Sequence, residues 1–264
     1  SLHIIDVHNP SKPVRMNTLD FNHGQFTDIQ VEKNHLYMSR DQVYTGYLEI
    51  YDISSPAQPQ KISELETGHL DKILAANGKV YVSQNGNGVL VVDVNQPQKP
   101  MQQGSWQLYK SSWSELGQIL DMELAGNYLL LATNTEGIKI LDIRPQQPAL
   151  AGELFVSGRV ADWIFFDGYI VVAHDENRIT VMKSNEYGQP TVVSALELTD
   201  TVNGFSSIAA EGNLIYTTGD SGTRVFDASS VTQLKEIGFV PEGADSIAVQ
   251  DGYIYLSGAN GMGL

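Results

Sequence analysis

Acidic side chains recur at one point of a repeating pattern in this chain, at or just before the first strand of five of the six predicted repeats. If they converge at one end of neighbouring repeats, they repel one another unless water, a lysine or a bound cation offsets the charge. Oxygen-rich sites of this kind suit Ca²⁺ or another divalent cation. The alternative is that each acid caps the start of its own strand through a local backbone hydrogen bond. The candidate metal ligands are Asp28, Asp71, Asp121, Asp162 and Asp245.

Three histidines, His23, His69 and His174, are predicted to lie in loops on the same side as these acids. Their candidate co-ligands are Asp28, Asp71 and Asp175. Imidazole and carboxylate groups together bind transition metals. No His-x-His pair occurs in the chain. The alternative is therefore that all three are exposed loop histidines with no metal-binding role, since metal ligands must converge in space.

A second set of candidate residues is aromatic or basic and lies in two long predicted loops, 106–118 and 39–46. Loops on a rigid scaffold often hold binding residues, and exposed aromatic rings mark interfaces. The alternative is that the rings pack locally onto the protein. The predicted partner-binding residues are Trp106, Tyr109, Trp113, Arg40 and Tyr44.

The elements that must position these residues repeat along the chain. The stretch 88–100, GVLVVDVNQPQKP, is a short apolar run that ends in an Asp and a Pro-bounded turn. A degraded copy at 179–190 has Lys183 in place of the Asp. A period of roughly 40–50 residues is typical of propeller blades or of helical-pair repeats. The closing aspartates are Asp6, Asp52, Asp93, Asp142 and Asp227, at intervals of 46, 41, 49 and 85 residues.

Composition selects between these two architectures. The apolar runs are short, rich in Val, Ile, Leu and Tyr, and bounded by Gly, Asn, Asp and Pro, which is typical of strands. No long stretch has the 3.6-residue apolar period of a helix. Each repeat is predicted to hold four strands, with a first turn such as Asn77-Gly78 or Asp167-Gly168 that needs positive φ. The sequence therefore predicts an all-β fold.

The two ends of the chain suggest how the repeats close. The chain begins with a predicted third strand, 2–7, and the last repeat is predicted to end at 258–264, before its third strand. We expect one domain, residues 1–264, that forms a six-bladed β-propeller of four-stranded antiparallel blades. Its terminal blade would combine N- and C-terminal segments, which removes open edges. The alternative is a piece of a longer array with unpaired edges at both termini.

Composition and charge exclude several classes of function. The hydrophobic content of 42% suffices for a sizeable core. The net charge of −15 disfavours nucleic acid and anionic membranes as partners. The sequence contains no run of 18 apolar residues, so it predicts no segment that spans a membrane. With no Cys, the chain has neither disulfides nor thiolate chemistry.

The runs LVVDV (90–94), LHIIDV (2–7) and KILDI (139–143), with preceding elements of the type NGKVYVSQNGNG (77–88), resemble the LVIVD repeat family. Lys183, Ser184 and Ala228 depart from the pattern. The resemblance implies a bacterial or archaeal β-propeller that is exported or at the cell surface. The expected location is therefore extracellular, cell-surface or periplasmic. The resemblance carries over no catalytic residues.

These observations favour a non-enzymatic binding or scaffold propeller that recognises a protein or a carbohydrate through its loop-rich face. We expect a monomeric domain, which could form part of a longer chain. One alternative is a metal-dependent hydrolase with its site at the acidic channel mouth, because six-bladed propellers include such enzymes. Another is a purely structural spacer. No G-x-S-x-G motif is present, and no nucleophile–base set follows from spacing.

Overall fold

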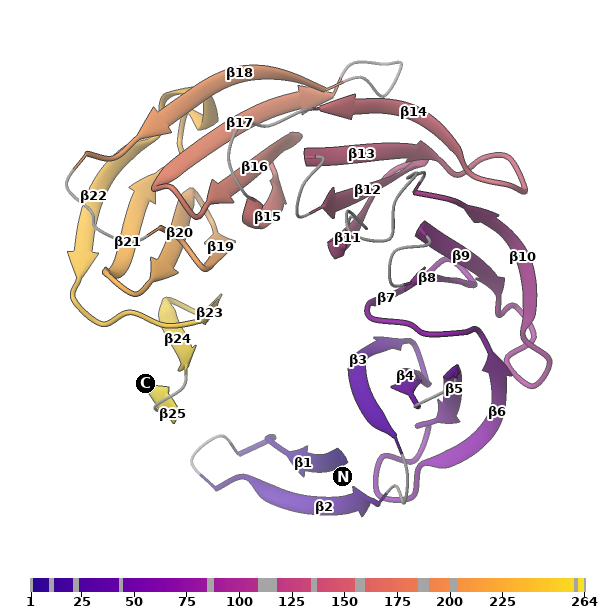
Figure 1. Ribbon diagram of the computed structural model, residues 1–264. Helices are drawn as coiled ribbons and strands as arrows, with labels where there is room; N and C mark the ends of the chain where they lie inside the picture. The colour runs from indigo at the N-terminus through magenta and orange to yellow at the C-terminus, as the bar shows by residue number, and fades with distance from the viewer. Residues whose placement is uncertain are drawn as a thin grey trace. The chain divides into compact units, whose positions relative to one another are not determined.

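The structure is a computed structural model of the 264-residue chain. Apart from one short 3-10 helix, η2 (Val231–Gln233), the regular elements of the described residues are strands (Figure 1). The all-β prediction is confirmed. The structure describes residues 2–9, 12–20, 24–42, 45–84, 88–108, 118–133, 137–154, 160–184, 190–199, 204–258 and 261–263.

Five four-stranded antiparallel sheets make up most of the described chain, and within each the strands lie in chain order. This confirms the prediction of four strands in each of these repeats. The sheets are β3 (Gln25–Glu32), β4 (His35–Asp41), β5 (Gly46–Asp52) and β6 (Gln60–Glu66); β7 (Ile73–Ala76), β8 (Lys79–Gln84), β9 (Gly88–Asp93) and β10 (Met101–Trp106); β11 (Ile119–Ala125), β12 (Tyr128–Thr133), β13 (Gly137–Asp142) and β14 (Ala149–Leu154); β15 (Val160–Phe166), β16 (Tyr169–His174), β17 (Arg178–Ser184) and β18 (Pro190–Glu197); and β19 (Ser207–Glu211), β20 (Leu214–Gly219), β21 (Gly222–Asp227) and β22 (Lys235–Val240).

Two smaller sheets contain the chain ends. β1 (Leu2–Asp6) pairs with β2 (Val14–Leu19), and β23 (Ser246–Gln250), β24 (Tyr253–Gly258) and β25 (Gly261–Gly263) form a three-stranded sheet. The prediction that the last repeat ends before its third strand is wrong, because β25 pairs with β24 in the place of a third strand. Backbone groups make the ladder, so a Gly-Met-Gly segment without an apolar run can still pair.

The chain divides into two compact units, residues 1–119 with 145–148 and residues 120–144 with 149–264. Each unit has its core between successive sheets. In the first, Leu48 and Ile50 of β5 pack in one buried cluster with Val80 of β8. In the second, Val181 of β17 packs in a cluster with Phe226 of β21. The strand faces are buried because each sheet covers its neighbour, which is why the runs are apolar on both faces.

The Asp that closes each apolar run has a local structural role. Its Oδ1 accepts the backbone N–H two residues further on, at 2.8 or 2.9 Å, in every repeat that carries it. Such an Asx turn ends the third strand and starts the Pro-bounded turn. The first turns of the repeats also behave as predicted, since Asn77 and Asp167 have φ of 55° and 48°. The motif is thus explained by turn chemistry.

A feature that the sequence did not predict recurs in the fourth strands. All six third–fourth strand pairs have a register shift at the same point, so one extra residue bulges from each fourth strand. A bulge bends and twists an outer strand, which hinders pairing with another sheet edge. The extra residues are Met16, Ile62, Gln103, Ala151, Val193 and Ile237.

Candidate functional site

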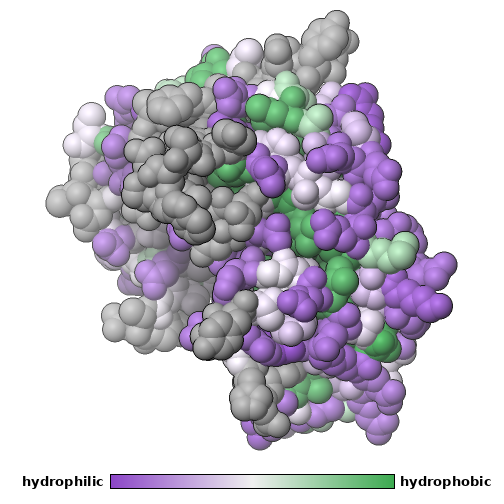
Figure 2. All heavy atoms as spheres, turned by 45° about the vertical axis from the view of Figure 1, so that its right-hand side comes forward, coloured by the Kyte–Doolittle hydropathy of each residue, from purple (hydrophilic) through white to green (hydrophobic). Residues whose placement is uncertain are grey.

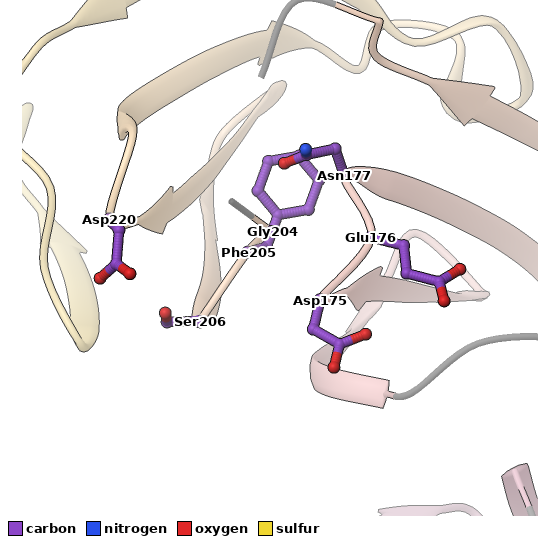
Figure 3. Close-up of a pocket in the computed structure, with 7 residues that line it drawn as sticks. All are labelled: Asp175, Glu176, Asn177, Gly204, Phe205, Ser206 and Asp220. Carbon is purple, nitrogen blue, oxygen red and sulfur yellow. The ribbon is translucent and has the colours of Figure 1, made fainter. Parts of the chain in front are cut away.

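A pocket of about 480 Å³ opens in the second unit where loops of two successive sheets meet (Figure 3). The β16–β17 loop supplies one side, the segment before β19 the floor, and the β20–β21 turn the other side. Ser206 lies between the Asp175 and Asp220 carboxylates in Figure 3. A loop before a first strand and loops between second and third strands therefore meet at this pocket. The lining residues are Asp175, Glu176, Asn177, Gly204, Phe205, Ser206 and Asp220.

Backbone contacts fix the floor of this pocket. Phe205 N–H donates to the His174 carbonyl at 3.1 Å, and Ser206 N–H donates to the Thr218 carbonyl at 2.7 Å. Gly204 packs against the backbone of Asp175 so closely that a Cβ there would overlap the Asp175 carbonyl oxygen. Only glycine allows such an approach. The carboxylates are therefore presented on loops whose backbone positions are tightly determined.

His174 lies beneath the pocket and not in the loop where it was predicted. It is the last residue of β16 and is fully buried. Its Nε2 bonds to the Thr180 hydroxyl at 2.9 Å, and Arg178 Nη2 lies 3.4 Å from its Nδ1. The prediction of a loop position is wrong because the second strand runs one residue further than its apolar pattern. The contact between His174 and Thr180 joins β16 to β17 next to the pocket loop.

Asp175, one of the predicted candidate ligands, shares a repeat position with Asp220 that the sequence analysis did not identify. Asp175 and Asp220 directly follow second strands, and Asp41 takes the same place at the end of β4. Asn85 and Asn134 hold this position in the sequence of the two intervening repeats. Aligning the residues after the second strands, in place of those before the first strands, would have identified this position.

The first unit has a related arrangement at the end of β4. His69 Nδ1 lies 2.8 Å from Asp41 Oδ1, which joins the segment before β7 to the end of the second strand. Asp71 follows nearby, and burial together with the Asp41 charge raises its pKa. The predicted residues His69 and Asp71 are thus brought together, with Asp41 as an unpredicted third group. The predicted His23 lies outside the described residues.

Two of the predicted metal ligands act as links between successive sheets. Asp28 Oδ1 accepts the N–H of Ile29 at 2.8 Å, and its Oδ2 accepts the N–H of Ile73 in the next sheet at 3.0 Å. Asp162 does the same, with its Oδ2 accepting the N–H of Ile208 at 2.9 Å. Bulges just before both residues turn their carboxylates toward the neighbouring sheet. The strand-cap alternative is supported here, with the cap extended to the next repeat.

Two further predicted ligands, Asp121 and Asp245, lie in or just before first strands. Asp121 is in β11, where its charge contributes to a raised pKa of about 7 for Glu123, after burial as the larger cause. Asp245 precedes β23, and its N–H donates to the Ser257 carbonyl at 2.9 Å. Within the described ranges, no three His, Asp or Glu side chains are grouped as a metal site would require. The divalent-cation site stays a prediction.

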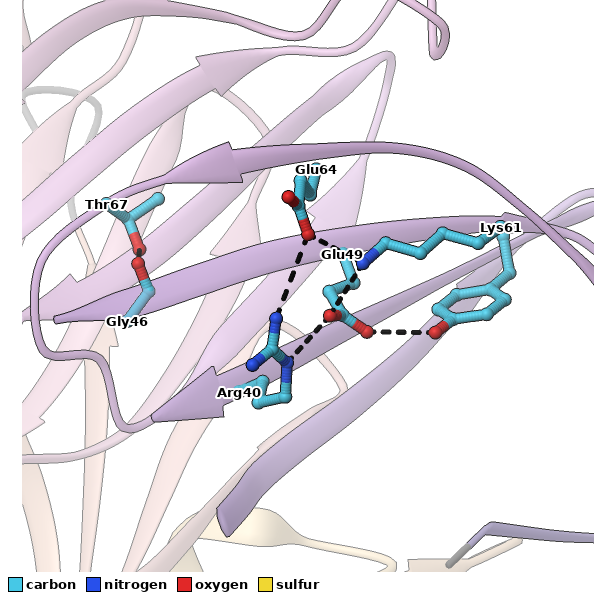
Figure 4. Close-up of polar contacts among 7 residues, drawn as sticks. Arg40, Gly46, Glu49, Lys61, Glu64 and Thr67 are labelled. Carbon is cyan, nitrogen blue, oxygen red and sulfur yellow. Dashed lines mark hydrogen bonds and ion pairs between the residues drawn. The ribbon is translucent and has the colours of Figure 1, made fainter. Parts of the chain in front are cut away.

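Arg40 belongs to an internal ion network in the first unit (Figure 4). Its Nε donates to Glu49 Oε1 at 2.7 Å, and Lys61 Nζ donates to the same oxygen at 2.8 Å. Tyr51 O–H donates to the other oxygen at 2.9 Å, and Lys61 also bonds Glu64 at 2.6 Å. Burial opposes ionisation of Glu49, but these donors outweigh it and lower its pKa. Arg40 therefore stabilises its own sheet.

The aromatic candidates are only partly described. Trp106 is the last residue of β10 and pairs with Val89, so it is a strand residue and not part of the predicted insertion. It extends the ladder of its own sheet. Tyr44, Tyr109 and Trp113 lie outside the described residues. Their predicted role in partner binding stays a prediction.

Comparison with known structures places this fold in the β-propeller-like class. A protein from Lactobacillus plantarum superimposes with a TM-score of 0.77 at 13% identity, over 95% of this chain and 82% of that one. The computationally designed Ika8 protein superimposes with a TM-score of 0.66 at 16% identity, over 90% of this chain and 69% of that one. At these identities the likeness shows the fold alone.

The family comparison is narrower and more specific. Residues 1–20, 23–67 and 68–107 match the LVIVD repeat. The chain therefore carries LVIVD repeats, and the predicted resemblance is confirmed over this part of the chain. No curated protein matches the chain. In the described part of the chain, no helix has the length and apolar character that crossing a membrane requires.

Proposed function

We propose that this chain is a non-enzymatic recognition module that binds a protein or carbohydrate partner through its loop face. The observation that carries the proposal is the pocket at Asp175 and Asp220, built from loops that tight backbone contacts hold in place. A rigid scaffold with polar groups converging on a concave surface is typical of binding sites. The LVIVD repeats support an exported or cell-surface location.

The charge of the molecule supports a partner that tolerates acidic surroundings. The net charge is −15, and Figure 2 shows hydrophilic residues over much of the visible described surface. Three carboxylates line the pocket, which suits the hydroxyl groups of a sugar or the basic side chains of a protein segment. The metal-dependent hydrolase alternative gains no specific support from the described residues, and the predicted divalent cation has no place in this proposal.

The test is a binding screen of the full chain on arrays of basic peptides and of oligosaccharides. For any probe retained, Asp175→Asn combined with Asp220→Asn should weaken binding by about tenfold or more, because charged hydrogen-bond partners are lost. The matched control is Asp167→Asn with Asp251→Asn, which removes the same charge at the turns between first and second strands. Equal binding by both double variants would refute the site.

We also infer that the six repeats form one six-bladed propeller in a single domain of residues 1–264. Its terminal blade would combine β23 and β24 with β1 and β2. The strand order supports this, because β1–β2 corresponds to a third–fourth strand pair, and the last sheet has first and second strands, the short β25 and no fourth strand in the described chain. Closure would require Leu2–Asp6 to take the third-strand place that β25 holds in part.

A further inference from the structure

The side chains of the pocket in the second unit supply negative charge and hydrogen-bond acceptors. Three of the side chains that line it are carboxylates, those of Asp175, Glu176 and Asp220. An ionised carboxylate accepts hydrogen bonds and donates none. No Lys, Arg or His is among the described residues that line the pocket. A ligand that complements this lining therefore brings donors and positive charge.

The backbone of the pocket floor adds little to the supply of donors. The N–H of Phe205 already bonds to the His174 carbonyl, and the N–H of Ser206 bonds to the Thr218 carbonyl. The Ser206 hydroxyl, which lies between the Asp175 and Asp220 side chains in Figure 3, can donate or accept. The pocket is consequently unsuited to an anionic ligand, which needs donors around it.

The floor also gives little aromatic surface on which a ligand could stack. Phe205 is only 6% exposed, because its ring packs in a buried cluster with Ile208 and Phe226. Recognition in this pocket must therefore come mainly from charge and hydrogen bonds. A sugar presents acceptors as well as donors, and its acceptors would find few partners here, which costs binding free energy.

The spacing of the carboxylates distinguishes an organic cation from a metal ion. Among the described residues, no three Asp, Glu or His side chains are grouped as one metal ion requires. Asp175 and Asp220 project from separate loops in Figure 3. The pocket volume of about 480 Å³ lies in the range of sites for organic ligands. A guanidinium or ammonium group on a chain has several donors that can bond to separated acceptors.

We propose that this pocket binds a basic side chain, arginine or lysine, of a partner protein. The inference rests on the proposed recognition function and selects the protein partner over the carbohydrate. The net charge of −15 supports it, because an acidic molecule attracts a basic partner and speeds their association. Arginine matches the pocket best, since its planar guanidinium has five donors and no acceptor.

The test is a calorimetric titration of the full chain with short capped peptides. Each peptide contains one arginine, one lysine or one citrulline, the neutral analogue of arginine. The arginine peptide should bind about tenfold more tightly than the citrulline peptide, or better, because charge-assisted hydrogen bonds are the stronger ones. Its binding should weaken as NaCl rises from about 0.05 to about 0.5 M, because salt screens the attraction.

Two single variants separate the pocket from the general negative charge of the molecule. Asp220→Asn keeps an oxygen acceptor, removes one charge and should weaken binding of the arginine peptide about tenfold. Asp167→Asn removes the same charge between β15 and β16 and should leave the affinity unchanged. Equal weakening by both variants would overturn the proposal, because it would indicate diffuse attraction. If Asp220→Asn fails to fold, Asp175→Asn provides the same comparison.

Other ligands would give different results. Suppose that an oligosaccharide binds, that Asp175→Asn with Asp220→Asn abolishes its binding, and that no basic peptide binds. This inference would then be wrong, and the proposed recognition function would stand. Binding of free spermidine without binding of any peptide would overturn the assignment to a protein partner. Absence of binding by every probe, with no Kd below about 1 mM, would contradict both proposals.

Discussion

At the scale of single residues, the pKa of a carboxyl group in this protein is raised or lowered according to its surroundings. Asp52 and Asp227 are partly exposed, and hydrogen bonds from Ser54 and Ser229 lower their pKa. Their contribution to stability is present above the unfolded pKa of about 3.9 and is lost as the pH falls below it. Glu123 is different, because burial, with Asp121 adding to it, raises its pKa to about 7.

The raised pKa of Glu123 makes a pH-dependence prediction. Between about pH 4.5 and 7 the folded state keeps a proton on Glu123 that the unfolded state has lost. The stabilising contribution is therefore full below pH 4.5 and declines as the pH rises to 7. Glu123→Gln should remove this decline and be more stable than wild type at pH 8, measured by urea unfolding at pH 5 and pH 8.

The control for this measurement is Glu197→Gln, at an exposed position of β18. It should leave the difference between the two pH values unchanged. A Glu123→Gln variant whose difference between pH 5 and pH 8 equals that of wild type would show that Glu123 ionises normally in the folded protein.

At the scale of elements, the β4–β5–β6 sheet depends on one buried carboxylate. Glu49 has a side chain only 3% exposed and receives bonds from Arg40 and Lys61, whereas Glu64 is 48% exposed. Removing one member of a buried ion network leaves the others unpaired in a poorly solvated place. Exposed ion pairs contribute little.

We therefore predict that Glu49→Ala lowers the free energy of unfolding by about 3–5 kcal/mol. Glu64→Ala, on the same sheet and with the same change in charge, should cost about 1 kcal/mol or less. Urea unfolding of the two variants measures both. Equal losses would mean that the network is solvated and that Glu49 has no special role in this sheet.

At the scale of the whole molecule, closure into six blades can be tested with a pair of introduced cysteines. The chain has no cysteine of its own that could form a competing disulfide. In the other sheets the third-strand residue two before the closing Asp faces the third residue of the second strand, as Val91 faces Tyr81. By this register Ile4 should face Tyr255 if β1 joins β24.

The variant with Ile4→Cys and Tyr255→Cys should form a disulfide within one chain under mild oxidation, detected by intact mass and mobility. Ile4→Cys with Tyr253→Cys is the control, because an offset of two residues places the Cα atoms about 8 Å apart. Cross-links only between chains, or none in either variant, would argue against closure.

The sequence by itself determined what depends on neighbours along the chain. Local effects include the apolar runs, the positive-φ turns such as Asn77-Gly78 and the Asx turn after each closing Asp. The all-β repeat could therefore be predicted from the amino-acid sequence alone. The third strand that contains Lys183 was predicted correctly although the closing Asp is missing there, because the flanking apolar pattern is kept.

Only the tertiary structure decided which side chains meet across repeats. Asp28 was predicted at the right place, but its bond to Ile73 crosses 45 residues. Burial of His174 and the use of Arg40 inside its own sheet depend on contacts between strands. Such contacts arise between residues far apart in the chain, and sequence periodicity specifies the strands but not the partners of their side chains.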